Sequence, residues 1–348
     1  MSDWSDLAIV TAMVLFLVAL VAHAAEWGAA RTVGTAATTR VWRSRASTAQ
    51  RRNRSLATVG GPADVVDEAG GDGGGPADGS ADVDDLTVER GDHVDPTTDR
   101  RVELFGRLGL NISVIATVCV LLGVVLRGIA AQRAPWGNMY EFTISAVAVI
   151  ALAHLVMGFR FGMRWIGLPV TLVLSLSLGL AITVLHVDVA PLVPALDSVW
   201  FIIHIAAATI AGAAFNIGAA ASILYLIRAR MERKGRVTGY FARMPDAAQV
   251  DAIAYRLHAF AFPLWTFAVA AGAVWAQYAW GRFWGWDPKE TWALVTWVIY
   301  ACYLHARVTA GWKGTRAAVI ALVGVASFWF NFYGVNLLFG GLHSYAGI

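Results

Sequence analysis

Eight long apolar stretches dominate this 348-residue chain and limit the folds that it can adopt. Each is long enough to cross a bilayer as a helix, which takes about 20 apolar residues. The stretches lie at about 7–25, 108–126, 141–159, 165–185, 199–227, 259–279, 290–306 and 317–339. The chain is 57% hydrophobic and only 15% charged. We therefore expect an all-α polytopic membrane protein with about eight transmembrane helices.

The basic residues predict how these helices are oriented, because cytoplasmic loops carry an excess of Lys and Arg. If the segment after the first stretch is cytoplasmic, 23 of the 27 Lys and Arg residues lie on that side. The other four face outward, and they are Arg127, Arg133, Arg282 and Lys289. We therefore expect a multi-pass protein of a cell membrane, a bacterial plasma membrane, with both termini outside.

The segment after the first stretch does not have the composition of a packed domain. It contains "GGDGGGPADGSADVDD", and residues 64–99 hold twelve Asp and Glu. Such a segment buries too little apolar surface to offset the entropy of ordering. The sequence predicts an N-terminal transmembrane helix (1–30), a long disordered cytoplasmic linker (31–103) and a core of seven helices (104–348).

Tryptophan is concentrated in "WGRFWGWDPKETW", residues 280–292, and six tryptophans lie within 275–297. By the predicted topology this segment faces outward. Asp287 and Glu290 flank Pro288 at the start of the next stretch, where acids and proline favour a helix N-terminus. Helix capping and direct contact with a ligand both remain open for these two carboxylates.

The histidines divide into two layers. His204 and His343 fall on the outer side with the tryptophans, whereas His305 falls near the inner end of the seventh stretch. A histidine inside a membrane is costly and is a functional candidate, although it can also serve only to bond a neighbouring helix. Two separated histidines beside aromatic residues favour a bis-imidazole haem over zinc or copper, which needs three or four grouped ligands. One or more of the four outer cations could pair with the haem propionates.

Several motifs resemble one known family. "WGRFWGWDPKETWALVTWVIYACYLHAR" resembles the tryptophan-rich WWD signature of haem-handling proteins, in the CcsA/ResC form of system II cytochrome c biogenesis. "SVWFIIHIAAATIAGAAF" and "GVNLLFGGLHSYAGI" resemble the two external histidine segments of that family, and "PWGNMYEF" resembles a further block. The resemblance covers about 104–348 and leaves out the linker.

The resemblance implies roles for particular residues. His204 and His343 match external axial ligands of the haem iron, and His305 matches an inner, membrane-embedded ligand. The haem-binding segment at 275–297 contributes Trp280, Trp284, Trp286 and Asp287. No catalytic residue distinct from those that bind haem b is expected.

The implied function is haem transport to the outer face and covalent attachment of haem to the C-x-x-C-H thiols of apocytochrome c, a holocytochrome c synthase activity. The resemblance also implies a CcsB/ResB-type membrane subunit that shares this activity, and no nucleic-acid partner. Two alternatives stay open: a haem exporter or chaperone without ligase activity, and a b-type cytochrome electron-transfer subunit. A plain solute transporter fits the tryptophans and histidines poorly.

Overall fold

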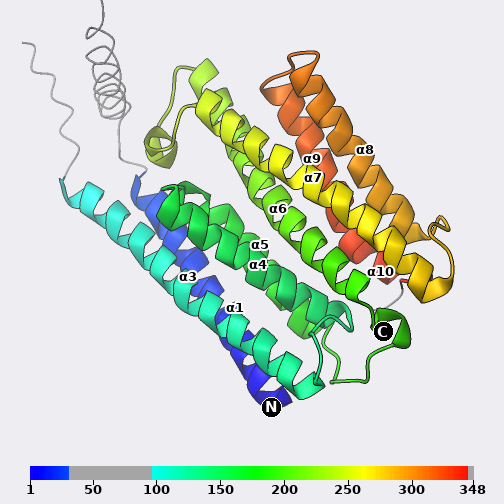
Figure 1. Cartoon of the computed structure of the whole chain (residues 1–348). Coiled ribbons are helices and arrows are strands. Elements are labelled where there is room, and N and C mark those ends of the chain that lie inside the picture. Colours follow the sequence, from blue (N-terminus) through cyan, green and yellow to red (C-terminus); the bar gives the residue numbers. More distant parts are fainter. Residues whose placement is uncertain (31–95, 344–348) are drawn as a thin grey trace, which may run out of the picture. The chain divides into compact units, whose positions relative to one another are not determined.

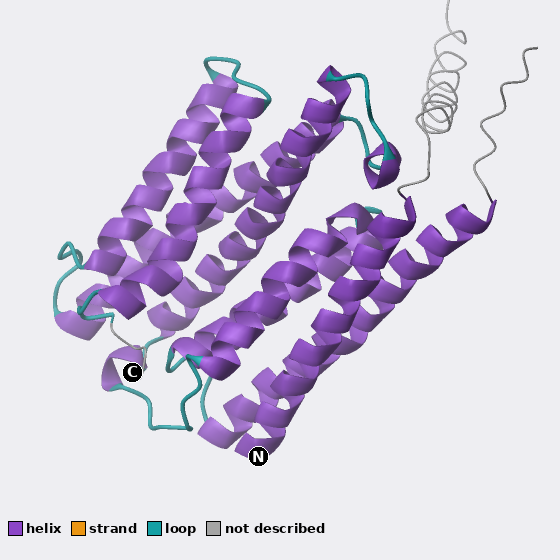
Figure 2. Ribbon diagram, turned by 180° about the vertical axis from the view of Figure 1, so that it is seen from behind, coloured by secondary structure: helices purple, strands orange, loops and turns teal. Residues whose placement is uncertain are grey.

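A computed structural model describes residues 1–30 and 96–343, and within them the regular structure is entirely helical (Figure 1, Figure 2). The prediction of an all-α polytopic membrane protein is confirmed. The long helices are α1 (Ser2–Ala29), α3 (Pro96–Ala131), α4 (Met139–Arg160), α5 (Gly167–Thr183), α6 (Val199–Arg233), α7 (Ala247–Trp280), α8 (Pro288–Val308) and α9 (Thr315–Trp329). A π-helical turn (Phe330–Gly334) and the short α10 (Val335–Leu338) continue α9.

Each of the eight predicted apolar stretches lies in a helix. Among the described residues, seven helices are long and apolar enough to cross a membrane, counting α9 to α10 as one. The exception is α8, which is 21 residues long but carries Lys289 and Glu290 in its first turn and His305 and Arg307 in its last. Charged and polar residues at both ends lower the mean hydropathy of α8, so its crossing of the membrane stays a prediction.

The predicted linker ends earlier than expected, because α3 already begins at Pro96. Residues 96–103 are therefore helical, and an exposed ion pair one helical turn apart, Arg107 Nε to Glu103 Oε1 at 2.7 Å, extends this polar start of α3. The rest of the predicted linker, 31–95, lies outside the described residues.

Despite its distance in sequence from the core, α1 packs within the bundle against α3 and α5. Polar contacts fix it at both ends. The Ser5 hydroxyl donates to the carbonyl of Gly123 (2.8 Å), Tyr140 donates to Asp6 (3.0 Å), and Tyr240 donates to Glu26 (3.0 Å). Because these bonds join α1 to α3, α4 and the segment before α7, the first helix is an integral part of the fold.

The centre of the bundle is α6, whose small buried residues let α4, α7 and α9 approach it closely. One apolar cluster joins α1, α3, α4 and α5 to one side of α6, and a second joins α6 to α7, α8 and α9. The N-terminus of α1 and the α7–α8 connection (281–287) lie at one end of the bundle (Figure 1, Figure 2), and His343 contacts Asp287 of this connection. We call this the cavity end.

Candidate functional site

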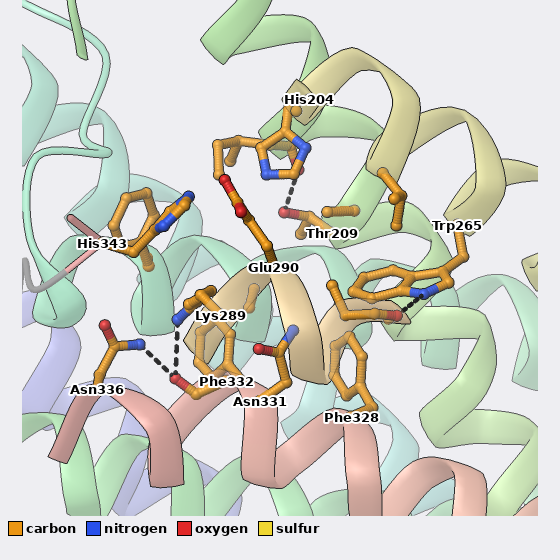
Figure 3. A pocket seen from close by; sticks show the side chains of 18 of the residues that line it. His204, Thr209, Trp265, Lys289, Glu290, Phe328, Asn331, Phe332, Asn336 and His343 are labelled. Atoms are coloured by element: carbon orange, nitrogen blue, oxygen red, sulfur yellow. Dashed lines mark hydrogen bonds between the residues drawn. The ribbon is translucent and has the colours of Figure 1, made fainter. Parts of the chain in front are cut away.

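A cavity opens at the cavity end between α4, α6, α7, α8 and the α9–α10 segment (Figure 3). It contains about 1280 Å³ of space not filled by protein atoms, including its open mouth. His204 and His343 both line it, and we call it the histidine cavity. Most of its wall is apolar or aromatic, including Phe142, Phe201, Trp265, Trp275, Trp284, Phe328, Trp329 and Phe332. The fold therefore brings the two predicted outer histidines to one apolar site.

His204 is held in one orientation and one tautomer. Its Nδ1 lies 2.7 Å from the carbonyl oxygen of Ala268 on α7, and because a carbonyl only accepts, Nδ1 must donate. The lone pair of the imidazole is then on Nε2, the form in which histidine binds a metal. The Trp275 ring stacks on the imidazole, with centroids 6.1 Å apart and an interplanar angle of 14°. The close fit requires glycine at Gly272, where a Cβ would lie 2.8 Å from Nδ1.

His343 is oriented by a carboxylate instead of a carbonyl. Its Nδ1 lies 3.0 Å from Oδ1 of Asp287. Burial would raise the pKa of Asp287, but hydrogen bonds from His343 and from the backbone N–H groups of Lys289 and Leu342 outweigh it and lower the pKa to about 2. Asp287 is thus ionised and accepts the Nδ1 proton, which again puts the imidazole lone pair on Nε2. Carboxylates orient metal-binding histidines in this way in many proteins.

The same carboxylate starts α8 and ties down the chain next to His343. Asp287 is the N-cap of α8, forms a capping box with Glu290, and accepts from the backbone N–H of Lys289 at 3.0 Å. Its second oxygen accepts from the backbone N–H of Leu342 at 2.8 Å. The predicted capping role is therefore confirmed, and the contact with His343 is an additional role that the sequence did not reveal.

The three predicted tryptophans have different surroundings, although the rings of Trp284 and Trp286 contact each other edge-on with centroids 5.9 Å apart. Trp284 lines the histidine cavity. Trp280 packs edge-on against His343, with centroids 4.7 Å apart. Trp286 adopts a left-handed backbone conformation (φ 58°) and is 67% exposed. Sequence reasoning did not single out Trp275, which is buried and contacts both His204 and His343.

His305 lies far from this site, near the other end of α8, as the sequence predicted. Its side chain is exposed, and its Nδ1 lies 3.5 Å from the hydroxyl of Thr309. Among the histidines that the structure describes, those buried outside the histidine cavity are His23, His154 and His258. The structure thus separates His305 from the outer pair, and its role as an inner ligand stays a prediction.

Comparisons with known proteins show which family this chain resembles. The family model described as "Cytochrome C assembly protein" matches residues 136–343, which include both histidines of the cavity. The chain belongs to the cytochrome c assembly protein family. The resemblance to the CcsA type is confirmed by relatives named "Cytochrome c biogenesis protein CcsA".

Two of these relatives illustrate the likeness. That of Mesostigma viride is 35% identical over 272 residues, covering 72% of this chain and 88% of the relative. That of Microcystis aeruginosa is 33% identical over 291 residues, covering 70% of this chain and 89% of the relative. Membership of the cytochrome c assembly protein family places this chain in cytochrome c maturation.

Proposed function

We propose that this chain binds haem in the histidine cavity, with His204 and His343 as axial ligands of the iron, at the outer face of a bacterial plasma membrane. The observation that carries the proposal is the pair of oriented imidazoles. Each donates from Nδ1 to a fixed acceptor, so that each presents Nε2 as the ligating nitrogen, and both line one apolar and aromatic cavity. Such a wall suits a flat macrocycle with two axial ligands.

The proposed reaction joins this haem to apocytochrome c. Each thiol of the C-x-x-C-H motif would add across one haem vinyl group: the S–H bond and the π bond of the vinyl group break, a C–S bond forms on one vinyl carbon, and the other vinyl carbon gains a hydrogen in place of the one that the thiol loses. No oxidant or reductant is consumed by the addition itself. The reaction depends on holding each thiol close to its vinyl group more than on a strong base. The contacts that fix His204 and His343 would serve this positioning.

A CcsB/ResB-type subunit is the proposed partner. We propose that it completes the complex and that His305 forms part of an inner haem site, from which haem reaches the histidine cavity. The location of His305 near the far end of α8 from Asp287 supports a path with two separate sites.

The function is tested by co-producing the chain with this partner and an apocytochrome, then measuring covalently bound haem. We expect His204→Ala and His343→Ala each to lower covalent haem at least about 10-fold, since each removes one axial ligand. His186→Ala is a matched control, because His186 is a partly exposed histidine that pairs with Asp6 at the cavity end and does not line the cavity. Unchanged covalent haem in both cavity variants would contradict the proposal. Haem that is bound but never attached would favour an exporter or a b-type cytochrome.

The close packing of Gly272 against the His204 ring gives an independent prediction. Gly272→Ala places a Cβ 2.8 Å from Nδ1 of His204, so the ring must move away from the Ala268 carbonyl. We expect the affinity for haem to fall about 10-fold, the lower end of the effect of disturbing a group that orients a metal ligand. Gly179→Ala on α5 is the control, because a Cβ there meets no atom within 4 Å. Haem titration of the purified complex measures both variants, and equal affinities would count against a fixed His204.

A further inference from the structure

Four cations were predicted on the outer side, and the structure gives them different surroundings. Two of them, Arg127 and Arg133, form ion pairs with the buried carboxylate of Glu141. Arg127 Nε lies 3.1 Å from Oε1 of Glu141, and Arg133 Nη1 lies 2.7 Å from Oε2. The guanidinium groups also donate to the backbone carbonyls of Val187 (2.6 Å) and Ala190 (3.1 Å). Arg127 and Arg133 therefore hold the 184–198 segment onto α3 and α4, and neither lines the histidine cavity.

Arg282 is also outside the cavity lining. Its Nη1 lies 3.7 Å from Oε2 of Glu290, and its guanidinium carbon lies 6.0 Å from the centre of the Trp280 ring. Its charge is thus directed at a carboxylate of the α8 cap and at an aromatic face on the α7–α8 connection.

Lys289 differs from these three arginines because it lines the histidine cavity. Its ammonium group has one long hydrogen bond, 3.4 Å to the carbonyl oxygen of Phe332, and Asn336 donates to the same oxygen at 2.7 Å (Figure 3). Within residues 1–30 and 96–343, no carboxylate lies within ion-pair distance of Lys289. The ring of Phe332 lies 5.9 Å from Nζ and adds a weak cation–π contact. An ammonium group has three donors, so one long hydrogen bond and one weak ring contact compensate poorly for its lost hydration.

We propose that Lys289 is a carboxylate subsite of the histidine cavity and binds a propionate of the haem. This inference rests on the proposed function. Two axial imidazoles fix the iron but leave the macrocycle able to rotate about the axis through them. Haem carries its two propionates on one edge, away from its vinyl groups. One cation in the wall selects the rotation in which the propionate edge faces α8, and it thereby sets where the vinyl groups meet the thiols.

The test compares haem with its dimethyl ester, in which both propionates are uncharged. Each is titrated into the purified, haem-depleted complex of the full chain with its partner, and binding is followed by the Soret absorption. We expect Lys289→Gln to weaken haem binding about 10-fold, the size of one charge-assisted hydrogen bond, and to leave ester binding unchanged. Lys289→Arg should retain most of the affinity for haem. Lys313→Gln is the matched control, because Lys313 is an exposed lysine that does not line the cavity, and it should bind both ligands like the unsubstituted chain.

Two results would overturn the inference: haem affinity unchanged in Lys289→Gln, or the same loss for haem and ester. The second result would mean that the substitution disturbs the start of α8 and not a propionate contact. Failure of the proposed function is distinguishable, because haem binding would then be insensitive to His204→Ala and His343→Ala whatever the result at Lys289.

Discussion

Replacing Asp287 by alanine is expected to lower the affinity for haem by about 100-fold, at the upper end of the range for residues that orient a metal ligand. The effect should be large because one carboxylate has three tasks. It accepts the Nδ1 proton of His343, holds the backbone of Leu342, and caps α8 beside the cavity. Asp287→Asn should have a smaller effect, because its amide oxygen can still accept the Nδ1 proton of His343. The contact with the backbone N–H of Leu342 is lost, since an amide nitrogen cannot accept.

Haem titration of the purified complex measures this loss, and thermal unfolding separates it from the loss of a helix cap, which costs only about 1 kcal/mol. Asp197→Ala is the control, since Asp197 is an exposed carboxylate two residues before the start of α6. Haem affinity in Asp287→Ala equal to that of the control would contradict the assigned role.

The pKa of Asp287 is lowered from 3.8 to about 2. Its stabilising contacts should therefore be fully present above about pH 4 and be lost as the pH falls through about 2.

The largest expected loss of stability follows from substitution of Glu141. Its side chain is fully buried and bonds Arg127, Arg133 and the backbone N–H of Gly137. Glu141→Gln leaves the charge of the buried Arg127 without a carboxylate, and breaking a buried pair in this way costs about 3–5 kcal/mol. We expect the variant to accumulate poorly and to unfold at a lower temperature in detergent.

Glu103→Gln is the comparison for this variant. Glu103 also bonds two arginines, Arg107 and Arg164, but its side chain is 44% exposed. Exposed pairs contribute about 0–1 kcal/mol, so the control should be nearly as stable as the unsubstituted chain. Equal stability of the two variants would mean that the cluster around Glu141 is not needed to hold α3, α4 and the 184–198 segment together.

The helices could be predicted from sequence because each depends on local composition. Runs of apolar residues gave all eight segments, and Asp287 with Pro288 gave the start of α8. The helix boundaries were harder to predict. The structure starts α3 at Pro96, inside the predicted linker, and the sequence did not show this because the first turns of α3 are polar. A polar helical end that extends beyond an apolar stretch leaves no hydropathy signal.

The site was only partly predictable, because its contacts join residues distant in the chain. The outer position and the residue types identified His204 and His343. No sequence spacing reveals that Asp287 orients His343, 56 residues away, or that the Ala268 carbonyl orients His204 from another helix. Trp275 was one of six clustered tryptophans, and only the tertiary packing brings its ring into contact with both His204 and His343. Likewise, charge alone could not separate Lys289 from the arginines that bond Glu141.

We propose that His204 and His343 bind the same iron from opposite sides. Electron paramagnetic resonance of the ferric complex tests it most directly, because two imidazoles give a low-spin signal whereas one imidazole gives a high-spin signal. We expect the complex to be low-spin at the histidine cavity. His204→Gly and His343→Gly should each become high-spin, and added imidazole should restore the low-spin signal. A low-spin signal that persists in both single variants without imidazole would contradict the claim.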